Sequence, residues 1–369
     1  MTDAPRLPVS RQASSPDGPF DLTPKLLASP LEGCPTGISS AEYFQGMEDF
    51  LAEDGYAALL AAASAECGRD LALDDAAGIV LRMEKHGTYY HPASVELVLR
   101  DGGRTKLCLL AATSLIGFLA MEEEYETIRE LSAAFPYGRL PRVHAQADRE
   151  SMAFMLAQWI EDRHEFHVSS NGRTILWDYS RGLRELSSAQ VFAVYEQAAH
   201  IAGLYYDLAS GRRIHPWHHA AGDFIAGLSA SGEVRVDLCS ARGREPILEN
   251  DGGPDFAARA LTAFFLDLTL RLRLDRMDGT GETVFLDERV LEAGLYGFFS
   301  AAEIRGYADK ARRMARDLTT ASPDALTGAL DERLSQFGPT DKAVLAPRLN
   351  AHAAALSSRL PAFARPPRG

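Results

Sequence analysis

The stretch from residue 78 to residue 133 has the clearest alternation of apolar and polar positions in the chain. Three short runs rich in Val, Leu and Ile are separated by turn-forming residues, at 78–84, 94–100 and 106–112. Short runs bounded by turns indicate successive antiparallel strands. The period then changes, because Tyr125, Ile128 and Leu131 recur at helical spacing. We therefore predict an antiparallel sheet with a helix over 122–133 packed on it.

Further elements flank this region. Ser40 and Glu42 introduce an apolar rhythm that predicts helices from 41 to about 67. Two more strands and a hairpin are expected downstream, over 142–146, 153–159, 165–169 and 174–177. Asn171-Gly172 joins the arms of the hairpin, and Asn-Gly between two β-rich runs is a strong turn signal.

The C-terminal half of the chain has helical periodicity almost throughout. Helices are expected over 187–209, 255–277, 286–318, 323–337 and 340–360, with one β pair between them at 224–228 and 233–238. This order predicts an α+β fold with an N-terminal sheet lobe over 41–160 and a mainly helical C-terminal lobe over 161–360. Many prolines predict a disordered tail over 1–40, and a similar tail is expected over 361–369.

Composition and charge exclude several classes of protein. The 369 residues carry a formal net charge of -13, which disfavours nucleic-acid and membrane partners, since both demand a basic surface. The longest apolar stretch is too short to cross a bilayer, and residues 1–30 lack the apolar core of a secretory signal. The four cysteines are scattered without a CxxC pair, so we expect reduced thiols and a cytoplasmic location. The charged run from Arg271 to Asp278 is expected to be a solvated helix end, with phosphate contact as the alternative.

Candidate chemistry gathers between residues 215 and 237. His215, His218 and His219 lie close together, and Asp223 and Asp237 bracket the β pair that follows. Interior packing of the histidines is one reading. A zinc site is another, because His215 and His219 are four residues apart and would share one face of a helix. The two carboxylates favour a shared metal ion, since paired strands bring the ends of a hairpin together.

The order of these elements resembles the small-molecule kinases of the protein-kinase-like fold, which include aminoglycoside and choline phosphotransferases. Glu124, Ile128 and Leu131 keep the spacing of that family's helix glutamate and the two apolar residues after it. Residues 140–143 resemble the entry into the family's fourth strand. Residues 155–161 resemble the hinge strand, whose backbone would hydrogen-bond adenine.

This resemblance covers about residues 78–280. It implies a bilobal protein-kinase-like fold, an N-terminal antiparallel sheet lobe with one helix, and ATP as a cofactor. It also implies that Glu124, Trp159 and Glu161 belong to the ATP-binding site.

The family's catalytic loop is His-Gly-Asp, four residues, Asn, and then a hairpin that ends in Asp. Gly222-Asp223 can match the Gly-Asp of this pattern or its Gly-Asn. We prefer the second register, because it preserves the distance to Asp237 and needs no deletion. His218 then takes the place of the catalytic aspartate. The resemblance implies His218 and Asp223 as catalytic residues, and Asp223 and Asp237 as ligands of Mg²⁺.

The preferred register carries three further expectations. The His218 imidazole should be exposed, and Asp223 should raise its pKa through a hydrogen bond. His219 should point the other way and pack inside. The carboxylates of Asp223 and Asp237 should lie within reach of one metal ion.

Two hypotheses about function follow, so whether the chain is an enzyme stays open. The first is an atypical Mg²⁺-dependent phosphotransferase that moves phosphate from a nucleotide to a small hydroxylated or amino substrate. The second is a catalytically inactive, pseudokinase-like binding or scaffold protein. The spacing of Asp223, Asp237 and His218 puts the first hypothesis slightly ahead, whereas two departures from the family pattern favour the second. Residues 110–114 replace the expected strand lysine, although Lys106 lies on the same strand, and Gly87 is the single glycine of the loop expected to cover the phosphates.

Overall fold

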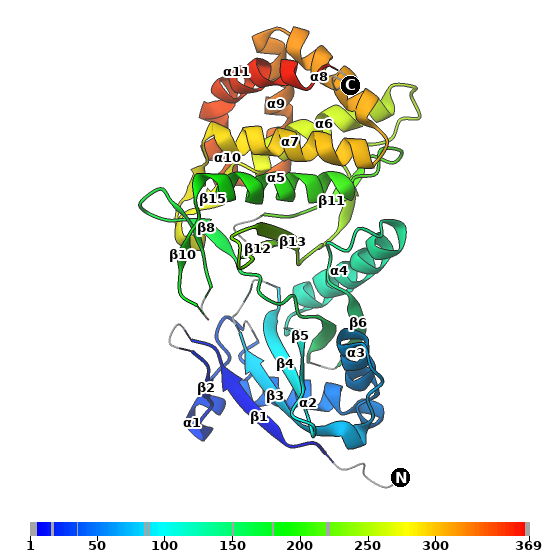
Figure 1. Ribbon diagram of the computed structural model, residues 1–369, viewed down its shortest axis with the longest axis vertical. Helices are drawn as coiled ribbons and strands as arrows, with labels where there is room; N and C mark the ends of the chain where they lie inside the picture. The colour runs from blue at the N-terminus through cyan, green and yellow to red at the C-terminus, as the bar shows by residue number, and fades with distance from the viewer. Residues whose placement is uncertain are drawn as a thin grey trace. The chain divides into compact units, whose positions relative to one another are not determined.

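The structure is a computed structural model of the full chain (Figure 1). It describes residues 6–15, 18–34, 36–84, 87, 89–149, 151–178, 181–218 and 222–365. These residues form an α+β protein that divides into two compact units. Unit 1 comprises Met1–Ala133 and Pro141–Glu161, and unit 2 comprises Ala134–Leu140 and Asp162–Gly369. The chain leaves unit 1 for the last time after Glu161, beside the predicted lobe boundary.

Unit 1 is built on a seven-stranded mixed sheet in the order β2-β1-β3-β4-β5-β7-β6. Its strands are β1 (Val9–Ala13), β2 (Phe20–Asp21), β3 (Ala76–Met83), β4 (His91–Leu99), β5 (Arg104–Ala112), β6 (Val143–Asp148) and β7 (Ala153–Gln158). Its helices are α1 (Pro24–Leu27), α2 (Ser40–Leu51), α3 (Ala57–Cys67) and α4 (Leu115–Ala134), with short 3-10 turns at Glu53–Gly55 and Leu73–Asp75.

The predicted antiparallel sheet with its packed helix is confirmed. β3 pairs with β4 and β4 with β5, both antiparallel, as the turn-bounded apolar runs require. Met121 and Tyr125 of α4 pack against Ala112, Ala153 and Met155 of the sheet. The helix begins at Leu115 rather than near residue 122.

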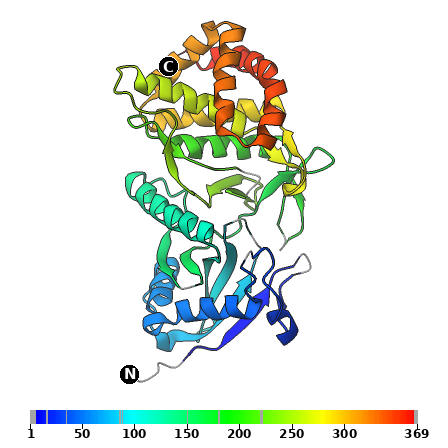
Figure 2. The same cartoon turned by 180° about the vertical axis from the view of Figure 1, so that it is seen from behind.

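The main core of unit 1 lies between the sheet and the helices α2 and α3 (Figures 1 and 2). α2 starts with a capping box, in which the side chains of Ser39 and Glu42 each accept a hydrogen bond from the other's backbone N–H. Phe50 of α2 stacks on Phe154 of β7, with ring centroids 5.2 Å apart. Alternate residues of β3, β4 and β5 therefore point into this core, and the intervening residues face away from α2 and α3.

The prediction of a disordered tail over 1–40 is corrected by the structure. β1 pairs in parallel with β3, with Val9 opposite Ile79. This pairing covers an edge of β3 that would otherwise expose its N–H and C=O groups. Pro8 lies just outside the strand, so it does not interrupt its hydrogen bonds. The second tail is also shorter than predicted, because the 3-10 turn Leu360–Ala362 is followed by Phe363, which stacks on Phe299.

Unit 2 combines small β pairs with a helical body. Its strands are β8 (Phe166–Val168), β9 (Thr174–Leu176), β10 (Arg184–Glu185), β11 (Arg212–Ile214), β12 (Phe224–Leu228), β13 (Val234–Leu238), β14 (Arg244–Pro246), β15 (Leu274–Arg276) and β16 (Thr283–Phe285). Its helices are α5 (Ser188–Leu204), α6 (Phe256–Arg271), α7 (Glu288–Ile304), α8 (Ala308–Thr320), α9 (Pro323–Arg333), α10 (Pro339–Leu345) and α11 (Leu349–Arg359), with 3-10 turns at Met277–Gly279, Leu334–Gln336 and Ala346–Arg348. The predicted hairpins β8–β9 and β12–β13 are both confirmed.

Glycine allows the helices α5 and α7 of unit 2 to approach closely (Figure 1). A β-carbon at Gly297 of α7 would lie 2.0 Å from the carbonyl oxygen of Glu196 on α5, so only glycine fits there. α6 is buried along almost its whole length. In the described part of the chain, no helix has both the length and the apolar character needed to cross a bilayer.

The first charges of the run from Arg271 to Asp278 are buried, contrary to expectation, whereas Arg276 and Asp278 are exposed as predicted. Arg271 donates from Nε to Asp267 Oδ2 at 2.8 Å, and both side chains are buried. Arg273 donates to the backbone oxygen of Leu286, and the fully buried Asp275 accepts from the backbone N–H of Val168. Arg271 and Asp275 are buried because they also find partners in distant parts of unit 2, the Gln336 carbonyl and the Val168 N–H.

Candidate functional site

The hairpin β12–β13 carries both candidate carboxylates. Apolar and polar residues alternate along it, so Phe224, Ala226, Val234 and Val236 are buried on one face. Asp237 belongs to the opposite face, where its register partner is Ile225. Gln197 of α5 fixes the hairpin in place, because its amide donates to Val234 O and accepts from the Val236 N–H.

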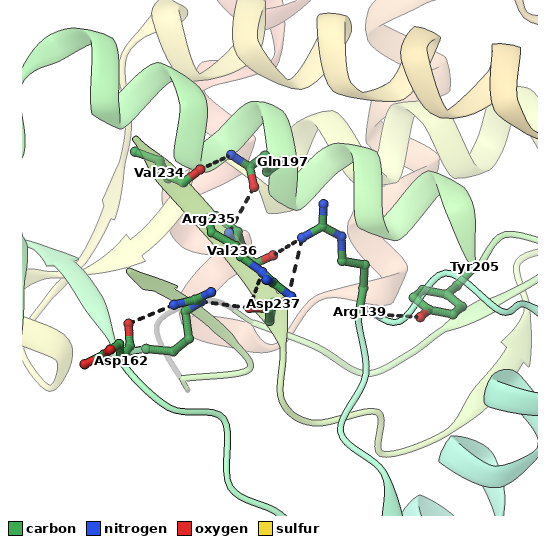
Figure 3. Close-up of polar contacts among 9 residues, drawn as sticks. Arg139, Asp162, Gln197, Tyr205, Val234, Arg235, Val236 and Asp237 are labelled. Atoms are coloured by element: carbon green, nitrogen blue, oxygen red, sulfur yellow. Dashed lines mark hydrogen bonds and ion pairs between the residues drawn. The ribbon is translucent and has the colours of Figure 1, made fainter. Parts of the chain in front are cut away.

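Three arginines converge on Asp237 (Figure 3). Arg163 Nε donates to Oδ2 at 2.8 Å, Arg235 Nε lies 3.5 Å from the same oxygen, and Arg139 Nη1 lies 3.6 Å from Oδ1. Arg139 also donates to the backbone oxygen of Val236 at 3.3 Å. We call Asp237 and these three arginines the Asp237 cluster.

The arginines of the Asp237 cluster reach it from three separate segments of unit 2. Arg235 lies two residues before Asp237 on β13, and therefore on the same face. Arg139 lies beside the free edge of β13, where its carbonyl accepts from the Leu238 N–H and its own N–H donates to the Tyr205 hydroxyl.

Arg163 lies beside the other strand of the hairpin. The next residue, His164, exchanges two backbone hydrogen bonds with Ala226 of β12. A β-carbon at Gly227 would lie 2.8 Å from Arg163 Nη1 and 2.1 Å from the Asp162 carbonyl oxygen. The missing side chain at Gly227 is therefore what lets Arg163 cross the hairpin to Asp237.

Charge in the Asp237 cluster is unbalanced. Its four side chains carry three positive charges and one negative charge. Asp237 is 5% exposed, whereas the side chains of Arg163, Arg139 and Arg235 are 14%, 30% and 60% exposed. Like unit charges about 4 Å apart repel by about 4 kcal/mol at an effective dielectric constant of about 20. The cluster thus favours a further anion at its exposed side.

Asp223 has a different environment, in which charge is balanced. It is fully buried, and Arg242 pairs with both oxygens, from Nη1 to Oδ2 at 2.7 Å and from Nη2 to Oδ1 at 2.5 Å. The backbone N–H of His218 also donates to Oδ2 at 2.7 Å. The preceding Gly222 has a φ of +75°, and a β-carbon there would collide with the Glu165 carboxylate, so glycine is required at this turn.

The residues at this hairpin do not fit a magnesium ion. Mg²⁺ binds carboxylate oxygens at about 2.1 Å and needs them available on one side. Arginine occupies the oxygens of Asp223, and Asp237 is surrounded by guanidinium groups that would repel a divalent cation. Within the described residues, no three His, Cys, Asp or Glu side chains gather closely enough to hold a metal ion.

His218 differs from its predicted state. It is not exposed, and burial lowers the pKa of its imidazole to about 4, with Asp275 acting in the opposite direction and Arg271 in the same direction. The expected hydrogen bond with Asp223 comes from the backbone N–H of His218 instead of the imidazole. The predicted rise in pKa is therefore wrong, and His218 is neutral at pH 7. His219 lies outside the described residues.

His215 is held by its neighbours rather than presented to a metal. Its Nδ1 lies 3.0 Å from Glu245 Oε2, and its Nε2 lies 3.1 Å from Arg271 Nη2. Burial, together with Arg213 and Arg271, lowers the pKa of His215 to about 3. This environment favours the packing interpretation over the zinc interpretation.

The candidates of unit 1 lie in two places, Glu124 on the helix α4 and Trp159 and Glu161 just beyond the end of β7. Glu124 of α4 is buried and accepts a hydrogen bond from the Tyr90 hydroxyl. Lys106 lies over the Trp159 ring, with Nζ 3.7 Å from the centroid, and 3.9 Å from Glu84. Burial lowers the pKa of Lys106. Glu161 is exposed just beyond β7. Glu124, expected in the ATP-binding site, therefore has Tyr90 as a partner. Lys106 of β5 contacts Trp159 of the predicted hinge.

Sequence reasoning missed all three arginines of the Asp237 cluster. One signal was available, because Arg235 and Asp237 alternate with buried valines on a predicted strand and must share a face. Nothing local to Arg139 or Arg163 points to Asp237. Comparison of the sequence with models of known families and with curated proteins finds no match.

Proposed function

We propose that this chain is a binding protein with a kinase-like plan that does not transfer phosphate. One observation carries the proposal. Asp237, at the position of the metal-binding aspartate in the family that the sequence resembles, is paired with three arginines instead of facing a cation site. A carboxylate in this state stabilises guanidinium groups. It does not hold a metal ion that would neutralise the phosphates of a bound nucleotide.

The order of elements supports the kinase-like plan. In unit 1, three antiparallel strands are followed by α4, and then by β6 and β7. In unit 2, the helix α5 precedes the loop of His218 and the hairpin β12–β13. This is the order that the resemblance requires, from the strand lysine position to the final aspartate.

Three local states argue against phosphoryl transfer. The charge of Asp223 is neutralised by Arg242, and the partly buried His218 imidazole, with a pKa of about 4, is a weak base at pH 7. Glu124 pairs with Tyr90, while Leu110 stands near the position of the family's lysine. Each of these residues would need a different partner to perform the family's chemistry.

A Mg²⁺-dependent phosphotransferase is the second candidate, and one observation favours it. Asp237 lies opposite Ile225, and Asp223 lies two residues before Ile225, so both carboxylates belong to the same end of the hairpin. For this candidate to hold, the arginines of the Asp237 cluster must leave when Mg²⁺ and nucleotide bind.

Thermal-shift and turnover measurements on the full chain separate the two candidates. The chain is titrated with Mg²⁺ and with ATP plus Mg²⁺, and ADP release is followed with a panel of amino and hydroxyl acceptors. We expect no shift with Mg²⁺ alone and no ADP release above that of the Asp237→Ala variant. Asp162→Ala is the matched control, because Asp162 is an exposed carboxylate beside Arg163. Mg²⁺-dependent ADP release that Asp237→Ala abolishes and Asp162→Ala retains would overturn the proposal.

A further inference from the structure

We propose that Arg139, Arg163 and Arg235 form a binding site for a dianionic phosphate group, either free phosphate or a small phosphomonoester. This inference rests on the proposed function, since arginines that hold a ligand phosphate at Asp237 exclude a metal ion there. The inference names the chemical class that the binding protein recognises.

The geometry of the Asp237 cluster supports this inference. Each guanidinium group is a planar fork of five N–H donors, which matches the oxygens of a phosphate. Asp237 can engage only some of these donors, and Arg139 and Arg235 lie 3.6 Å and 3.5 Å from it, beyond a strong charge-assisted hydrogen bond. Their side chains are 30% and 60% exposed, so a ligand can reach them from solvent.

Charge selects a phosphate over a carboxylate. The four side chains of the cluster sum to two positive charges, which a dianion neutralises and a monoanion does not. Two neighbouring groups among the described residues leave this sum unchanged. Asp162 points its carboxylate to Arg181 at 3.1 Å, and burial, together with Arg139, lowers the pKa of His200 on α5, so His200 is neutral at pH 7.

Asp237 has a positioning role in this site. It pulls three guanidinium groups to one point, where each would otherwise repel the others. The backbone restrains them further, because Arg139 donates to Val236 O and Arg163 donates to the carbonyl oxygen of Asp162 at 3.0 Å. The donors are thus held in place before a ligand arrives, which reduces the entropy lost on binding.

Isothermal titration of the full chain with inorganic phosphate and with glycerol 3-phosphate, at constant ionic strength, tests the inference. Acetate serves as the monoanion comparison. Arg235→Ala should weaken phosphate binding roughly 10- to 100-fold, the value of a charge-assisted hydrogen bond. The matched control is Arg173→Ala, because Arg173 is equally exposed at 60% and pairs with Glu185, away from the cluster. It should bind phosphate as the unmodified chain does.

A second variant should strengthen phosphate binding instead of weakening it. Asp237→Asn keeps a side-chain oxygen that can accept from Arg163 but removes the competing negative charge, so the three positive charges should bind phosphate more tightly. Tighter binding of glycerol 3-phosphate than of phosphate identifies an organic phosphomonoester as the ligand, and the reverse identifies the free ion. The inference is overturned if neither anion binds at millimolar concentration, or if Arg235→Ala and Arg173→Ala behave alike. If neither anion binds and no ADP is released, the phosphate site is wrong but the proposed function stands. Mg²⁺-dependent ADP release would contradict both the phosphate site and the proposed function.

Discussion

Asp223 and Asp237 are two buried carboxylates on one hairpin, and arginine surrounds them in opposite ways. Asp223 receives a single guanidinium fork and one backbone N–H, so its charge is balanced and enclosed. Asp237 gathers three arginines from three segments. Their positive charges exceed the single negative charge of Asp237, and the arginine side chains are partly exposed. A charge-balanced ion pair stabilises the fold, whereas exposed guanidinium groups in excess of the carboxylate favour the binding of an anion from solvent.

Removal of the Asp223 carboxylate should have the largest effect. Asp223→Ala leaves Arg242 largely buried and the His218 N–H without an acceptor, which should lower the free energy of unfolding by roughly 3–5 kcal/mol. Urea denaturation measures this loss, and added phosphate should not restore it. A loss below about 1 kcal/mol would show that the Asp223 pair is not structural.

A pH series should place acid sensitivity at His218, whose backbone N–H donates to Asp223. His218 has a pKa of about 4 in the folded chain, against about 6.5 when unfolded. The unfolded state therefore binds the extra proton between these values, and the stability from neutral His218 is lost as pH falls from about 6.5 to 4. The difference in unfolding free energy between the unmodified chain and His218→Gln should change by roughly 1–3 kcal/mol over this window. A pH-independent difference would mean that His218 is solvated.

Removal of the Asp237 carboxylate should cost less and depend on salt. Asp237→Asn leaves three guanidinium groups to repel one another, but two are partly exposed, so we expect a loss of about 1–2 kcal/mol at low ionic strength. Because salt screens exposed charges, the loss should shrink at 1 M NaCl. Asp223→Asn is the matched substitution and should show little salt dependence. An equal salt dependence of the stability loss in both variants would contradict the difference that we infer between the two carboxylates.

The smallest effect is expected at Arg235. Its side chain is 60% exposed and its contact with Asp237 is long, so Arg235→Ala should change the free energy of unfolding by less than about 0.5 kcal/mol. The same variant should lose phosphate binding. A large destabilisation by chemical denaturation would instead make Arg235 part of the fold.

The sequence predicted those elements whose signals are local. Alternation and turn residues place β3 to β5 and the hairpins β8–β9 and β12–β13, and helical spacing places α4. β1 escaped prediction because it pairs in parallel with a strand about seventy residues away, and the surrounding prolines suggested disorder. Parallel pairing with a distant strand needs no tight turn, so the sequence next to the strand carries no turn signal.

The candidate site was predicted only in part, for a related reason. Spacing located Asp223 and Asp237, but not their partners. Arg139 and Arg163 lie 98 and 74 positions before Asp237, and only the folded chain brings them together. Burial was equally hidden, because groups that contact His218, Arg271 and Asp275 come from distant segments. Whether a polar residue is exposed depends on such partners and not on its own type.

A crystal structure of the full chain grown with both Mn²⁺ and phosphate would test whether the Asp237 cluster holds an anion and not a metal. Manganese takes the same oxygen ligands as magnesium and is identified by its anomalous scattering. We expect tetrahedral density bound by Arg139, Arg163 and Arg235, and no manganese peak at Asp237. A manganese peak on the carboxylates of Asp223 and Asp237, with the arginines turned away, would contradict the anion site and favour the phosphotransferase.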